Sequence, residues 1–193
     1  MNYNFSVEDY SLEEIKNDCY LHDLFIDGSS QLENVAATIQ SLYFYGAAVA
    51  SHQCPKSLEA SLCRTLTIMS YSIVEAIVLS VAFKIQDKCQ SCKHPCANRS
   101  STVIDAPKEK RFWEADEFLK KHKIIYFADK DINKFYEDFR LSRNNVHLMK
   151  KAEVLYKDPN YLPDKCQMAI KFLKVFIDTI HDNFRMYLNM NHC

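Results

Sequence analysis

The chain has 193 residues, a formal net charge of −1 and only two glycines. This length suits one domain that buries a core without disulfides, and the near-zero charge excludes a general attraction to nucleic acid. Tight turns between strands usually need glycine, so its scarcity argues against a sheet protein. We therefore predict an all-α fold, an up-and-down bundle of about five to six helices in a single domain covering residues 1–193.

Apolar residues recur at helical spacing in several segments along the chain. The run 27–30 breaks the first segment, and Pro55 separates the second from the third. Pro159 and Pro163 lie in the predicted turn that precedes the last segment. The predicted helices span about residues 7–26, 31–52, 58–86, 112–122, 130–156 and 164–188.

The third predicted helix contains the longest apolar stretch, residues 66–83, with Glu75 in its middle. A carboxylate and several serines in this stretch favour a buried central helix over a membrane span. The amino terminus is acidic and shows no signal-peptide pattern. We therefore expect a cytoplasmic protein with no membrane partner.

Residues 87–110 lack helical periodicity and are predicted to form a loop insertion. The spacing of Cys89, Cys92 and Cys96 is that of half a zinc site. Cys166 would reach this loop if successive helices simply alternate in direction. One interpretation is a structural zinc that closes the loop, and the other is a set of free thiols. No His-Glu-x-x-His arrangement is present, so we expect no cofactor to be required for catalysis.

The fifth predicted helix carries two rows of residues on adjacent faces. Spacings of three and four predict a buried seam of Ile132, Phe135, Phe139, Ser142, Val146 and Met149. The row beside it contains Tyr136, Arg140, Arg143 and His147. At about 100° per residue, Arg140, Arg143, Asn144 and His147 lie within about 100° of one another. Two cations, an amide and an imidazole together can bind a phosphate and move a proton.

This segment resembles the signature helix of the HEPN superfamily, in which an arginine is followed after four to six residues by a histidine. Arg140 has six residues between it and His147, and Arg143 has the polar follower Asn144 that the family often shows. Either arginine is therefore a candidate for the family role. The resemblance implies a helical bundle and a metal-independent endoribonuclease that dimerises with two motifs facing each other.

The resemblance also implies a biological setting and residue roles. The setting is that of toxin–antitoxin or phage-defence effectors, with RNA as substrate and an antitoxin or regulatory protein as a further partner. His147 would act as general base or acid. Arg140 and Arg143 would bind phosphate, and Asn144 would orient the imidazole.

Two alternatives remain open from the residues. The arginines can instead pair with acidic neighbours such as Glu137, with His147 a satisfied interior histidine. The same fold can also serve as a non-catalytic module that binds a nucleotide or a partner protein. Glu75 bears on both, because a buried carboxylate needs a partner. We expect it to hold Arg140 or Arg143, and the alternative places it on a solvent-facing stripe.

Overall fold

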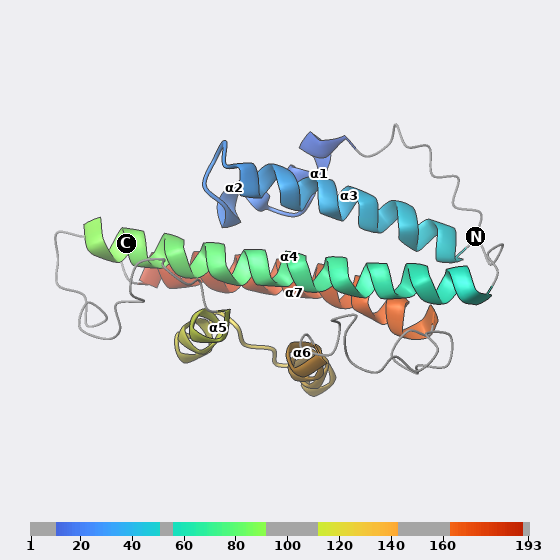
Figure 1. The fold of residues 1–193 in the computed structure, drawn as a ribbon. Helices are drawn as coiled ribbons and strands as arrows, with labels where there is room; N and C mark the ends of the chain where they lie inside the picture. The colour runs from blue at the N-terminus through green and yellow to red at the C-terminus, as the bar shows by residue number, and fades with distance from the viewer. Residues whose placement is uncertain (1–10, 51–55, 92–111, 143–162, 191–193) are drawn as a thin grey trace.

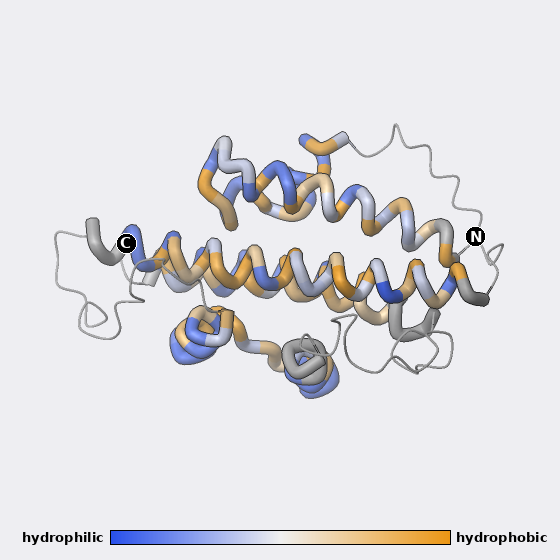
Figure 2. Tube along the Cα trace, in the orientation of Figure 1, coloured by the Kyte–Doolittle hydropathy of each residue, from blue (hydrophilic) through white to orange (hydrophobic). Residues whose placement is uncertain are grey.

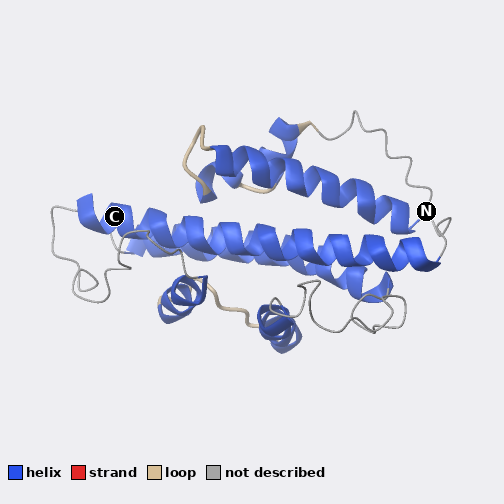
Figure 3. Cartoon of the chain, viewed as in Figure 1, coloured by secondary structure: helices blue, strands red, loops and turns tan. Residues whose placement is uncertain are grey.

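The computed structural model describes residues 11–50, 56–91, 112–142 and 163–190, and within these ranges every regular element is a helix (Figure 3). The predicted all-α bundle is therefore confirmed. The helices are α1 (Leu12–Asp18), α2 (Leu21–Leu24), α3 (Ser30–Ala50), α4 (Lys56–Ser91), α5 (Phe112–Lys121), α6 (Lys130–Ser142) and α7 (Pro163–Met190).

The first predicted helix is two helices in the structure. Ser11 caps α1: its hydroxyl accepts from the backbone N–H of Glu14, whose carboxylate accepts from the N–H of Ser11. This reciprocal pairing fixes where α1 starts. Tyr20 has a φ of 53° and breaks the helix before α2. An L-residue pays strain in this left-handed conformation, and the Tyr20 ring here stacks on His181 of α7 with centroids 4.0 Å apart.

The helices form three layers, as Figure 1 shows. α1, α2 and α3 lie on one side of a central pair made of α4 and α7, and α5 and α6 lie on the other side. α3 runs antiparallel to α4, whereas α4 and α7 run in the same direction. α5 and α6 are seen nearly end-on, so they cross the central pair. The chain thus departs from simple up-and-down alternation after α4.

α4 is the central helix of the bundle and packs against α3, α5 and α7. Its residues from 73 to 82 are mostly buried and aliphatic, and Figure 2 shows hydrophobic residues recurring along α4. The stretch Leu58–Lys88 is long and apolar enough to cross a membrane, but 56% of its most apolar window is buried inside the protein. The core helix of a soluble protein passes the same test of length and composition.

In the described part of α6, the prediction of which side chains are most buried is wrong. Tyr136, placed by the sequence on the flanking row, is fully buried, whereas Ile132 and Phe135 of the predicted seam are only partly buried. The reason lies in α5, where Asp116 accepts a hydrogen bond from the Tyr136 hydroxyl. A buried tyrosine needs such a partner, and helical spacing does not reveal it.

Candidate functional site

The predicted catalytic cluster lies partly on α6 and partly after it in the sequence. Its members are Arg140, Arg143, Asn144 and His147. Arg140 lies on α6, one helical turn after Tyr136. Its side chain, and the whole of Arg143, Asn144 and His147, lie outside the described residues. Their grouping on one helical face therefore stays a prediction. What the structure describes of this segment is the helical backbone of α6 up to Ser142.

Four side chains join α5 to α6, and we call Asp116, Lys120, Tyr136 and Glu137 the α5–α6 clamp. The Tyr136 hydroxyl donates to Oδ1 of Asp116 at 2.5 Å. The Lys120 ammonium lies 3.1 Å from the other carboxylate oxygen of Asp116 and 2.5 Å from Oε1 of Glu137. It also lies 5.1 Å from the centre of the Tyr136 ring. Glu137, which the sequence offered as a partner for the arginines, is thus engaged by Lys120.

Aromatic side chains join α6 to α7. The ring of Tyr136 is nearly parallel to that of Phe176, at 5.8 Å and 11°. Phe135 packs on Phe172 with centroids 4.9 Å apart. Aromatic pairs of this kind add to the stability gained by burying the rings. The described half of α6 is therefore fixed on two sides, by the clamp and by α7.

Glu75 lies near the middle of α4 and is half-buried. The prediction that it holds Arg140 or Arg143 falls on side chains outside the description, so it stays a prediction. Half-burial on the central helix fits neither a fully enclosed carboxylate nor an open solvent stripe. Its position is the boundary between core and surface, where a carboxylate keeps part of its hydration.

The predicted zinc clip changes in two respects. α4 continues to Ser91, so Cys89 lies on a helix and not in the loop predicted over residues 87–110. Because α4 and α7 are parallel, their carboxyl ends lie together, and Lys88 and Leu188 line one cleft. Cys166 lies 22 residues before Leu188 on α7, or roughly 33 Å away at ~1.5 Å per residue. Cys166 is therefore too far to complete a site with Cys89.

Cys92 and Cys96, with the side chain of Cys89, lie outside the described residues. Among the side chains that are described, no group of three or more His, Cys, Asp or Glu is placed to hold a metal ion. Cys19 and Cys63 are buried thiols that form no disulfide. Burial raises the pKa of Cys19, so its thiol stays protonated at neutral pH. A zinc clip among Cys89, Cys92 and Cys96 stays a prediction.

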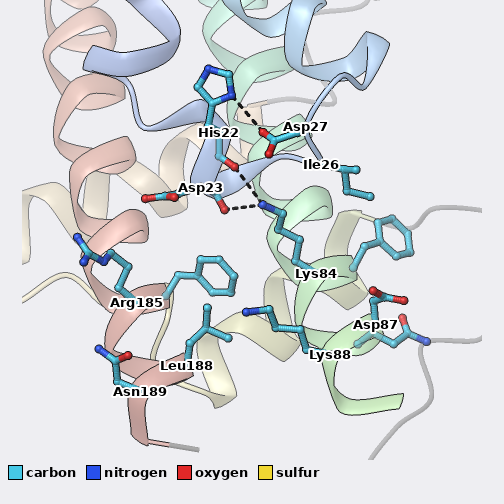
Figure 4. A pocket seen from close by; sticks show the side chains of 13 residues that line it. His22, Asp23, Ile26, Asp27, Lys84, Asp87, Lys88, Arg185, Leu188 and Asn189 are labelled. Atoms are coloured by element: carbon cyan, nitrogen blue, oxygen red, sulfur yellow. Dashed lines mark hydrogen bonds and ion pairs between the residues drawn. The ribbon is translucent and has the colours of Figure 1, made fainter. Parts of the chain in front are cut away.

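A cleft of about 1020 Å³ opens between α2 and the carboxyl ends of α4 and α7 (Figure 4). On its upper wall the Lys84 ammonium donates to the backbone oxygens of His22 and Asp23, at 3.2 and 2.7 Å. His22 pairs with Asp27 at 3.1 Å. Asp23 also lies 2.8 Å from Nε2 of His181. The lysine therefore binds the carbonyls that α2 leaves unpaired at its end.

The cleft was not predicted from the sequence. Its residues come from three distant segments, around 22–27, 83–88 and 184–189. His22 has its carboxylate partners on Glu13 of α1 and on Asp27 after α2. His181 pairs with Asp23 of α2 and with its own neighbour Asp182. The lining mixes Lys84, Lys88 and Arg185 with aspartates, beside helix ends of negative dipole. Of these cations, Lys84 binds the end of α2, and the mixed lining favours no single ligand charge.

Two histidines are expected to titrate on opposite sides of pH 6.5. The hydrogen bond that His22 donates to Asp27, and a second to Glu13, raise the pKa of His22. Burial, followed by the charge of Lys121, lowers the pKa of His122. The contribution of His22 to stability is thus present below about pH 6.5 and is lost as pH rises through its folded pKa. His122 acts in the opposite sense, reducing stability as pH falls below about 6.5.

Two-dimensional NMR of the imidazole C–H signals against pH checks this pair. Asp27→Asn should bring the His22 midpoint down toward its ordinary value and leave that of His122 unchanged. Coincident midpoints for the two histidines would contradict the geometry of both sites.

Compared with protein-family models, curated protein sequences and solved structures, the chain matches none of them.

Proposed function

We propose that this chain is a HEPN-like, metal-independent endoribonuclease. It would act as a homodimer in the cytoplasm, as a toxin–antitoxin or phage-defence effector whose activity a partner protein restrains. The observation that carries the proposal is the Arg140-to-His147 motif. This motif starts on α6, in a chain whose described residues form an all-helical bundle.

The chemistry follows from the residue types. His147 takes the proton from the ribose 2′-hydroxyl, and the 2′-oxygen attacks the neighbouring phosphorus. The bond to the 5′-oxygen breaks, and that oxygen takes up a proton as it leaves. Arg140 or Arg143 stabilises the charge on the phosphorane through a planar fork of donors. The products are a 2′,3′-cyclic phosphate and a 5′-hydroxyl.

The experiment is incubation of purified protein with a structured RNA in EDTA, with analysis of the product ends. We expect cleavage that leaves 2′,3′-cyclic or 3′-phosphate ends and does not need added metal. The His147→Ala variant should not cleave the RNA at the wild-type rate. Its matched control is His22→Ala, because His22 is an exposed histidine on α2 and lies outside the proposed machinery. Cleavage that requires Mg²⁺ or leaves 3′-hydroxyl ends would contradict the proposal.

A second candidate is a non-catalytic HEPN-like helical module that binds a nucleotide or a partner protein. It is favoured by the cleft of about 1020 Å³ beneath α2, which is as large as known ligand pockets. The slightly negative net charge agrees with it, since proteins that grip long RNA are usually basic. Equilibrium dialysis with mononucleotides separates the two candidates: tight binding with no RNA cleavage would favour the module.

A further inference from the structure

α6 is attached to the bundle differently from α5. α5 packs closely along α4, whereas the described backbone of α6 makes few close approaches to other helices. α6 is held by side chains: Phe135 and Tyr136 reach α7, and Tyr136 and Glu137 reach α5. The position of α5 is thus set by its packing on α4, whereas the position of α6 depends on side-chain contacts with α5 and α7.

The α5–α6 clamp is built on a carboxylate that is completely buried. Asp116 is 0% exposed, as is Tyr136, while the side chains of Lys120 and Glu137 are 29% and 35% exposed. Burying a carboxylate is costly even when it is paired, and an apolar residue at this position would pack without that cost. In the arrangement seen, Tyr136 and Glu137 of α6 present a hydroxyl and a carboxylate to α5 together, so these pairs favour this register of α6.

We propose that Asp116 is a positioning residue for the ribonuclease site, acting through Tyr136 and Lys120 on the register of α6. This inference rests on the proposed ribonuclease function. Tyr136 and Glu137 are the last two α6 residues whose side chains the structure describes, and Arg140 follows within one turn. A shift of α6 along or about its axis moves Arg140 with it. Displacements of about 1 Å in a catalytic group can cost roughly 100-fold in rate.

The test uses full-length protein carrying Asp116→Asn, Tyr136→Phe or both. We expect kcat for RNA cleavage to fall by roughly 10- to 100-fold with KM within about threefold of wild type. The double variant should be no slower than the slower single variant, because both remove the same link. Amide hydrogen exchange across residues 130–142 should rise, while that of α3 stays unchanged.

Two further variants keep the test sound if Asp116→Asn fails to fold. Lys120 is partly exposed, so Lys120→Met should fold and lose kcat, and Lys120→Arg should restore most of it. The matched control is Asp178→Asn, which breaks an exposed pair with Lys174 on α7, 3.0 Å long. This control should keep both the wild-type kcat and the wild-type exchange in α6.

The outcomes separate this inference from the ribonuclease proposal. If wild type cleaves RNA and the Asp116 and Lys120 variants cleave it with unchanged kcat, the positioning role is overturned and the ribonuclease stands. If wild type does not cleave RNA, the ribonuclease fails and with it the catalytic part of this role. Hydrogen exchange then decides the remainder, since unchanged exchange in α6 of Asp116→Asn would overturn the clamp as well.

Discussion

His147→Ala protein is expected to lose about 10²- to 10⁴-fold in kcat for RNA cleavage. This is the range that a general acid or base contributes, and alanine leaves no group to take the 2′-hydroxyl proton. Binding of RNA should change little, because the proposal assigns the phosphate contacts to the arginines. Single-turnover cleavage together with fluorescence anisotropy on an uncleavable RNA measures the two effects separately.

The two arginines can be ranked in the same assay. Alanine in place of the arginine that stabilises the phosphorane should lower kcat by about 10²- to 10³-fold. Lysine at that position should not restore kcat, because it lacks the planar fork of donors. Alanine in place of the other arginine should mainly weaken RNA binding and lower its salt dependence. Wild-type cleavage by His147→Ala would rule out this mechanism, whatever the arginines do.

Phe176→Ala is expected to lower the free energy of unfolding by about 3–5 kcal/mol, the range for a buried phenylalanine. Phe176 is 0% exposed, and its ring lies between those of Phe127, Tyr136 and Phe172, at 6.2, 5.8 and 5.8 Å. Removing it leaves a cavity where α6 meets α7. The midpoint of thermal unfolding should fall by on the order of 10 °C.

The control for this prediction is the preceding residue. Val175 lies on the same helix but is 38% exposed, so Val175→Ala should change stability by less than about 1 kcal/mol. Urea unfolding followed by circular dichroism compares the two variants directly. An equal loss from both substitutions would mean that α7 does not have the buried face described above.

Helices could be placed from the sequence because the period of their apolar residues is a local signal. The predicted spans 31–52 and 164–188 differ from α3 and α7 by only a residue or two. The break at Tyr20 was missed, because its support is the ring of His181 on the last helix. The burial of Tyr136 was misjudged for a similar reason, since Asp116 supplies its partner from α5.

In the candidate site too, local patterns could be predicted from the sequence and contacts between distant segments could not. Arg140, Arg143, Asn144 and His147 could be singled out because their spacing lies within one short segment. The clamp and the cleft depend on pairs that meet only after folding, such as Lys84 with the carbonyls of α2. Nothing in the local sequence around these lysines, histidines and aspartates distinguishes them from other charged residues of the chain.

The parallel course of α4 and α7 has a consequence for synthesis of the protein on the ribosome. α3 and α4 are neighbours in sequence and can pair as soon as both have emerged. The other side of α4 waits for α7, which is made only after α5 and α6. The apolar surface of α4 that α7 covers therefore stays bare until α7 has emerged. A nascent chain that holds α1 to α6 exposes a surface suited to chaperones.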